Sequence, residues 1–138
     1  MVCTFFGKRD APSSVRWRVR DEINRLIDEG VDLFYVGNNG NFDLPLQSVL
    51  LDIGGSRSDF RFFVVLSRLN EGVNVEWHST LFPEELSSVP PRFAISVRNR
   101  WMINNSDIVV TYTNDRFSAS FKWREAAKRR GLRIIDLG

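Results

Sequence analysis

The chain has 138 residues, of which 43% are hydrophobic and 26% charged, a length and composition typical of one globular domain and not of a disordered or fibrous chain. Its formal net charge of +2 permits an anionic partner without requiring one. The only cysteine is Cys3 and the only histidine is His78, which excludes an intrachain disulfide and argues against a structural zinc site.

The sequence contains no apolar run near the roughly 18 residues that a membrane span needs. Its first residues, MVCTFF, predict a strand and lack the basic leader and cleavage site of a signal peptide. A single cysteine suits a reducing compartment. We therefore expect one domain over residues 1–138 in the cytoplasm, with no membrane, metal or cofactor.

The first half of the chain predicts alternating strands and helices. Runs rich in β-branched and aromatic residues predict three strands, over residues 2–6, 33–36 and 60–66. Apolar residues at helical spacing predict one helix after Pro12-Ser13-Ser14 that ends at Gly30, and a second that ends at Gly54. Asn41 or Asp43 is expected to cap the second helix, with Pro45 in its first turn.

The second half begins with residues 67–89, which show no clear periodicity and predict a long loop of a kind that is often functional. Beyond it we expect a helix from Pro90 to about Asn105, a strand over 107–112, a helix over about 117–130 and a strand over 132–137. Helical connections between short buried strands imply an α/β fold, in which a mostly parallel sheet of about five strands lies between two helical layers.

Ligands of such sheets bind beyond the carboxyl ends of the strands. Two of the segments there combine glycine with polar residues: Gly7-Lys8-Arg9, and the run of residues 37–43, GNNGNFD. Glycine lets the backbone approach a ligand, and the N–H groups of a helix start favour an anion. Either segment alone is equally well explained as a tight turn, and neither matches a P-loop or the G-x-G-x-x-G fingerprint. Two at neighbouring strand ends favour an anion-binding crevice.

Two charged residues in the second half are candidates for chemistry. Arg98 shares a helix face with Trp101 and Met102, so its guanidinium either points into a cleft or lies beside a core stripe with its head in water. Glu125 is either a solvated carboxylate or, if it faces the same pocket as Arg98, an acid or base. His78 has no second metal ligand at suitable spacing, which favours a loop histidine without a special role.

Between Arg116 and Arg133, seven cations are opposed by Glu125 alone. This excess is explained either by a solvated helix face, with cations favoured near the helix C-terminus, or by a nucleic-acid patch. The second alternative needs interleaved aromatic residues on the surface. Phe117, Phe121 and Trp123 are candidates, but their apolar spacing would bury at least some of these rings.

Four segments resemble one family in order and separation: FFGKRD at 5–10, FYVGNNGNFD at 34–43, PRFAI at 91–95 and RNRWM at 98–102. Together they resemble a family of small bacterial proteins of unknown function in the SLOG superfamily, and the resemblance spans about the whole chain. This Rossmann-like superfamily includes the "lonely guy" nucleotide phosphoribohydrolases, the DNA-processing protein A domain and sensors of nucleotide-derived signals. The superfamily often forms dimers or larger assemblies, so the resemblance implies a homodimer.

The resemblance places Arg98 at the catalytic arginine of the phosphoribohydrolase segment R-K-x-x-M, with Asn99 where those enzymes carry lysine. Their motif G-G-x-G-T-x-x-E corresponds to residues 118–125, SASFKWRE, so Glu125 matches the catalytic glutamate but no glycine is present. The nearer family has two glycines where this chain has Ser118 and Ala119, and a histidine where it has Lys8. Side chains there narrow the approach of a phosphate, which argues against the hydrolase.

We therefore expect a module that binds or senses a nucleotide or nucleotide-derived small molecule at the carboxyl edge of the sheet. The expected ligand-binding residues are Gly7, Lys8, Arg9, Gly37, Asn38, Gly40, Asn41, Phe42, Asp43, Arg98, Asn99, Trp101, Tyr112, Ser118 and Ala119. Arg98 would clamp a phosphate, while Trp101 or Tyr112 would stack on a base. One alternative is cleavage of an N-glycosidic bond by Arg98 and Glu125, and a weaker one is a nucleic-acid-binding domain.

Overall fold

A computed structural model describes residues 1–8, 11–38, 40–73, 75–76, 79–113 and 115–138. Within these residues, one six-stranded parallel sheet has the strand order β4-β3-β2-β1-β5-β6. The strands are β1 (Val2–Gly7), β2 (Leu33–Val36), β3 (Arg61–Val65), β4 (Thr80–Leu81), β5 (Ile108–Tyr112) and β6 (Arg133–Asp136). The α-helices are α1 (Val15–Asp28), α2 (Gly40–Gly54), α3 (Ala94–Asn104) and α4 (Ala119–Arg129).

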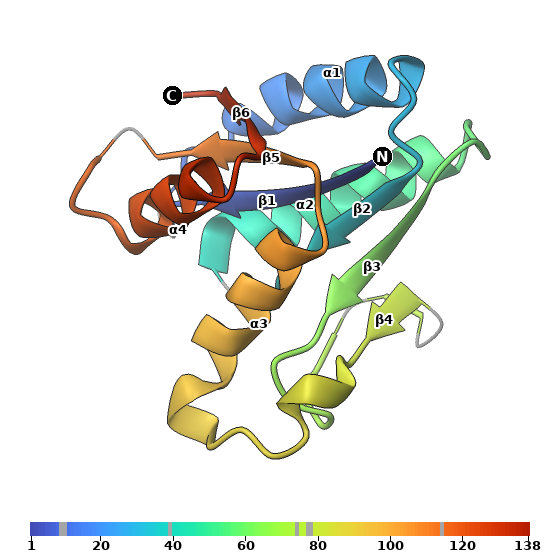
Figure 1. Cartoon of the computed structure of the whole chain (residues 1–138). Helices are drawn as coiled ribbons and strands as arrows, with labels where there is room; N and C mark the ends of the chain where they lie inside the picture. The colour runs from blue at the N-terminus through green and yellow to red at the C-terminus, as the bar shows by residue number, and fades with distance from the viewer. Residues whose placement is uncertain (9–10, 39, 74, 77–78, 114) are drawn as a thin grey trace.

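The described elements form three layers, with α1 and α2 on one face of the sheet and α3 and α4 on the other (Figure 1). The chain first builds outward from β1 through β2 and β3, then crosses back so that β5 pairs with the free side of β1. The strand order therefore reverses between β1 and β5. This arrangement confirms the α/β fold that the alternating pattern predicted.

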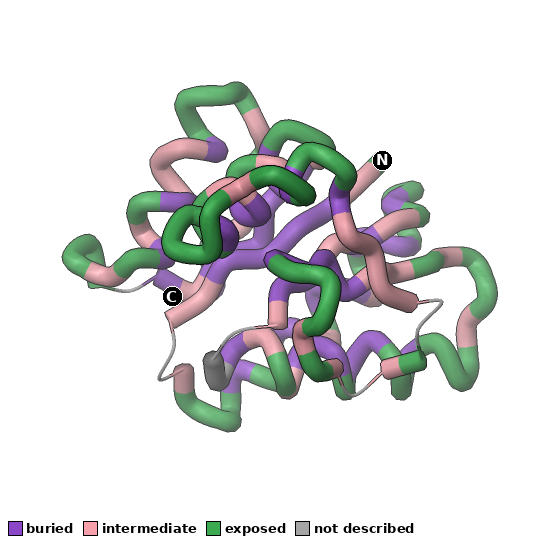
Figure 2. Tube along the Cα trace, turned by 90° about the horizontal axis from the view of Figure 1, so that it is seen from below, coloured by how far each residue is buried: buried purple, intermediate pink, exposed green. Residues whose placement is uncertain are grey.

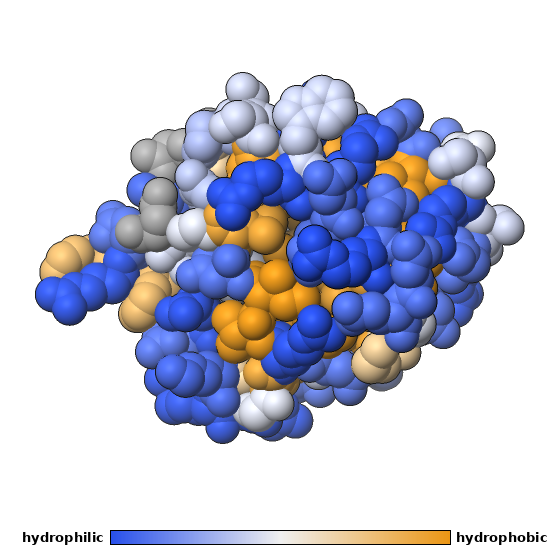
Figure 3. All heavy atoms as spheres, turned by 90° about the horizontal axis from the view of Figure 1, so that it is seen from above, coloured by the Kyte–Doolittle hydropathy of each residue, from blue (hydrophilic) through white to orange (hydrophobic). Residues whose placement is uncertain are grey.

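The pleat of β1 supplies both cores, because successive side chains of a strand point to opposite faces. Cys3 and Phe5 pack under α1 and α2, whereas Phe6 packs with Met102 of α3 and Trp123 of α4. Figure 2 shows the buried segments running through the middle of the molecule, with exposed residues in the outer connections. Most of the face seen in Figure 3 is hydrophilic, with apolar side chains showing between polar ones.

The segment expected to be one long loop contains a sixth strand, so that expectation is wrong in part. Thr80 and Leu81 form β4 and pair with Val64 and Val65 of β3. The short 3-10 helix η2 (Glu84–Leu86) follows. Two paired residues are too few to produce a periodic sequence pattern, which is why the pattern did not reveal this strand.

One expected helix start is wrong and another differs in detail. The helix expected from Pro90-Pro91 to about Asn105 opens at Pro91 as the 3-10 helix η3 (Pro91–Phe93) and continues directly as α3 from Ala94. Pro90 before it is extended, as expected for a residue that precedes a proline. The second helix, α2, already begins at Gly40, so Asp43 lies inside it instead of capping it, and Pro45 lies in its second turn. None of the described helices combines the length and hydrophobicity needed to cross a bilayer.

Candidate functional site

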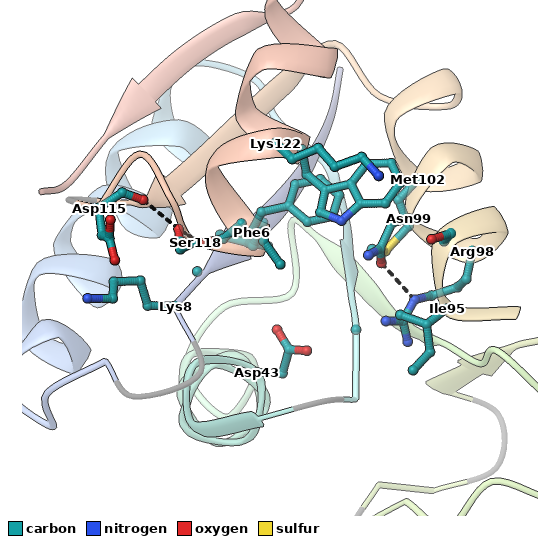
Figure 4. Close-up of a pocket in the computed structure, with 17 residues that line it drawn as sticks. Phe6, Lys8, Asp43, Ile95, Arg98, Asn99, Met102, Asp115, Ser118 and Lys122 are labelled. Carbon is teal, nitrogen blue, oxygen red and sulfur yellow. Dashed lines mark hydrogen bonds between the residues drawn. The ribbon is translucent and has the colours of Figure 1, made fainter. Parts of the chain in front are cut away.

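A cavity of about 700 Å³ opens at the carboxyl edge of the sheet, beside the end of β1, close to where the strand order reverses. Its walls come from β1, the loop after β2, the first turn of α2, one face of α3 and the start of α4. In Figure 4, Lys8, Asp43 and Arg98 surround the same space from three different elements, with Lys122 of α4 above them. Reversals of strand order are where doubly wound sheets bind ligands.

Several residues singled out from the sequence line this cavity. They are Gly7, Lys8, Gly37, Asp43, Arg98, Asn99, Ser118 and Ala119. Asn38, Phe42, Trp101, Tyr112 and Glu125 are not among its lining residues. Arg9 lies outside the described residues, as do the side chains of Gly40 and Asn41. The structure thus brings together about half of the expected set.

Gly7 is required by packing inside the protein. A Cβ at this position would lie 2.2–2.5 Å from ring atoms of Phe42, which is 2% exposed and packs in the core under α1 and α2. Real Cβ atoms do not approach other atoms so closely. The glycine therefore admits the Phe42 ring, and Phe42 itself is a core residue beneath the cavity.

Gly37 makes room for two oppositely charged side chains, the partly buried Asp43 and the buried Arg98. A Cβ here would lie 2.8 Å from Asp43 Oδ2 and 3.4 Å from the guanidinium carbon of Arg98. Both charged groups thus converge on the same backbone position, at the cavity wall. Gln47 fixes this loop, because its Nε2 donates to the Gly37 carbonyl oxygen and to Asn38 Oδ1, each at 2.9 Å.

Arg98 is a buried cation with 2% of its surface exposed. Its Nε donates to Asn99 Oδ1 at 3.0 Å, and its Nη1 donates to the carbonyl oxygen of Val65 at 3.4 Å. Burial lowers the pKa of this guanidinium, and the negative charges of Asp43 and Glu71 oppose that shift. The sequence left open a cleft-facing or a water-facing Arg98, and the structure places it at the cavity wall, shielded from water.

The start of α4 points at the cavity and is capped by Ser118. Ser118 Oγ accepts a hydrogen bond from the Phe121 backbone N–H at 3.3 Å and donates to the carbonyl oxygen of Asp115 at 2.7 Å. Its φ of −75° is ordinary for a residue with a side chain. This loop therefore uses serine as a helix cap where the compared motifs use glycine, and Ser118, Ala119 and Ser120 at the start of α4 line the cavity.

The cavity also has walls that the sequence argument missed. Phe6 and Trp123 stack with ring centroids 6.1 Å apart, and Lys122 Nζ lies 5.2 Å from the Trp123 ring centre. Asp115, Ser120, Ile95, Ser96, Met102 and Phe5 complete the missed set. The spacing of Ala119 and Trp123 places them on one face of α4, but which face meets the cavity depends on where the helix begins.

The remaining candidates lie elsewhere. Glu125 Oε2 lies 3.6 Å from Arg124 Nη1, away from the cavity lining. Trp101 packs edge-on against Tyr35, with ring centroids 5.0 Å apart. Tyr112 packs against the core under α1 and α2. Among the described residues, no group of three His, Cys, Asp or Glu is placed to hold a metal ion.

Comparison with known proteins adds a likeness of fold. No family model matches the chain, and no curated protein matches it by sequence. The chain is similar in structure to DNA processing protein A from Helicobacter pylori, described for a unique single-stranded DNA binding mode, with a TM-score of 0.69 and 13% sequence identity. The match covers 99% of this chain but only 64% of that one. The structural likeness supports a Rossmann-like fold for this chain, and at this low identity it shows the fold alone.

Proposed function

We propose that the chain is a single domain that binds a nucleotide or a nucleotide-derived small molecule in the cavity beside β1. The observation that carries this proposal is the meeting of Lys8, Lys122 and the start of α4 at one cavity on the carboxyl edge. Its volume of about 700 Å³ lies within the range of small-molecule sites. The resemblance of four segments to a small family of the SLOG superfamily and the likeness of fold to DNA processing protein A support the same proposal.

In this proposal the phosphate lies at the start of α4. The first N–H groups of a helix carry partial positive charge and attract anions, and Lys122 of the same helix adds a full charge at the cavity wall. Arg98 lies beneath the surface of the same wall, where the nearby Asp43 carboxylate offsets part of its charge. We favour binding over hydrolysis, because Glu125 is not among the residues that line this cavity.

The test is a thermal-shift screen with nucleoside mono-, di- and triphosphates, followed by calorimetric titration of each hit. Removing a charged hydrogen-bond donor costs about 1.5–3 kcal/mol, so Lys122→Ala should weaken binding by roughly ten- to a hundredfold. Lys128→Ala is the matched control, because Lys128 is exposed in the last turn of the same helix and is not among the lining residues. The proposal is contradicted if no nucleotide of the screen shifts the melting temperature, or if both variants lose the same binding affinity.

A second candidate is binding of single-stranded nucleic acid along α4. Phe117 is 85% exposed, with the Arg116 guanidinium 5.2 Å from its ring centre, and Phe121 has Arg124 at 5.5 Å. Exposed rings beside cations are the elements of a stacking platform for unpaired bases. The relative from Helicobacter pylori is described as binding single-stranded DNA. The interleaved aromatic residues that this alternative requires are thus partly at the surface, although Trp123 is buried.

An oligo(dT) titration at several salt concentrations separates the two candidates. Loss of a base–aromatic stack costs about 1–3 kcal/mol, so Phe117→Ala should weaken binding at least fivefold. Phe93→Ala is the control. Phe93 is 48% exposed, and the Arg92 guanidinium lies 4.8 Å from its ring centre, before α3 and not beside α4. Equal effects of both substitutions, or affinity that does not fall as salt rises, exclude the nucleic-acid candidate.

A further inference from the structure

A second cavity adjoins the first along the carboxyl edge. It measures about 630 Å³ and lies among the loop after β3, the segment after β4 and the start of α3. Ile95 lines both cavities and is 47% exposed. The two spaces are therefore neighbours on either side of one exposed side chain in the first turn of α3.

The electrostatic field also links the two cavities. Glu71 lines the second cavity, and its charge acts on Arg98 at the wall of the first. Arg98 Nη1 donates to the Val65 carbonyl oxygen, at the end of β3 from which the loop with Glu71 departs. Arg98 thus lies at the wall of the first cavity, where the charges of Asp43 and of Glu71 from the second cavity both act on it.

The chemistry of the second cavity differs from that of the first. Apolar walls come from Leu69, Phe82, Val89 and Pro91. The Glu71 carboxylate is occupied within the loop, because it accepts hydrogen bonds from the Ser67 N–H at 3.0 Å and from Ser67 Oγ at 3.3 Å. Apolar walls suit the faces of an uncharged ring.

Polar groups at the rim of the same cavity could hydrogen-bond to the edge of such a ring. Arg68, Asn70 and Ser87 line it and are exposed, so a guanidinium, an amide and a hydroxyl are available to the edge of a bound ring. A few polar groups on a largely apolar wall are the usual means by which a small-molecule site fixes the orientation of its ligand.

We propose that the ligand spans both cavities and belongs to the dinucleotide class, with its phosphates in the first cavity and an uncharged ring in the second. This inference rests on the proposed function. It explains why the binding edge carries a second cavity of nearly the same size, since one mononucleotide is accommodated by the first alone. Ile95 then packs against the ligand between its two halves.

The experiment compares AMP with two dinucleotides that contain it, NAD and diadenosine diphosphate, by calorimetric titration. Ser87→Trp fills the second cavity from an exposed position. Ser88→Trp is the matched control, because Ser88 is the next residue, is exposed, and is not among the residues that line either cavity. Circular dichroism checks that both variants fold.

We expect at least one dinucleotide to bind tenfold or more tightly than AMP. Ser87→Trp should abolish most of that advantage and change the AMP affinity by less than twofold, whereas Ser88→Trp should leave both affinities unchanged. Dinucleotide and AMP affinities that are equal, or an advantage that survives Ser87→Trp, overturn the two-cavity ligand while the proposed function stands. If none of the three compounds binds, nor any other nucleotide of the panel, the proposed function itself fails.

Discussion

At the scale of single residues, a substitution at Gly7 tests whether this glycine is needed for packing or for ligand binding. We expect Gly7→Ala to destabilise the protein by about 1–3 kcal/mol, the usual cost of overpacking, because the added Cβ would collide with the Phe42 ring. Urea denaturation followed by circular dichroism measures the loss. Gly72→Ala is the control, because a Cβ there meets nothing within 4 Å. Phe42→Leu should restore part of the loss in the Gly7→Ala background, as a double-mutant cycle would show.

The sequence located this glycine at the end of a strand but did not reveal the side chain that packs against it. A glycine after a strand indicates that something approaches the backbone closely, and it does not indicate whether that is a ligand or a side chain from 35 positions along the chain. Gly37 is similar, since Asp43 and Arg98 fill the space beside it. If Gly7→Ala abolished ligand binding without loss of stability, the glycine would be needed for the approach of the ligand and not for packing.

At the scale of elements, the start of α4 depends on the hydroxyl of Ser118. Ser118→Ala should destabilise the protein by about 1 kcal/mol, the typical value of a helix N-cap, because the Phe121 N–H loses its acceptor. Ser14 offers a matched control: it occupies the same cap position of α1, but its side chain makes no cap hydrogen bond. Thermal melts of both alanine variants test this, and equal shifts would mean that the Ser118 hydroxyl does not stabilise α4.

The helices and long strands could be predicted because their patterns extend over many residues. The stripe of Val15, Val19 and Ile23 defines α1, and the unbroken apolar run into Val65 defines β3. β4 could not be predicted, since its two residues pair only because β3 is already in place. A cavity does lie at the edge of the sheet where the sequence predicted a site. The orientation of Lys122 and Trp123, which line it, depends on where α4 begins, and sequence periodicity locates that start only to within a few residues.

At the scale of the whole molecule, the two cores share β1, so we expect both faces to unfold together. Cys3 reports on the face under α1 and α2, where it is fully buried and burial raises the pKa of its thiol well above the usual range. Because the thiolate is the reactive form, Cys3 should react with an alkylating reagent only after the protein opens. The alkylation rate in native buffer then measures the open fraction, provided that closing is faster than reaction.

A substitution on the opposite face tests this coupling. Ile103 of α3 is buried in the core on the face of the sheet that α3 and α4 cover. Ile103→Val should lower the free energy of unfolding by about 0.5–1.5 kcal/mol. If one sheet couples both faces, Cys3 alkylation should become roughly two- to tenfold faster. Ile95→Val, on the exposed side of the same helix, should leave the rate unchanged. An unchanged rate in Ile103→Val would mean that the face with Cys3 opens independently, and the chain would then unfold as two units on one sheet.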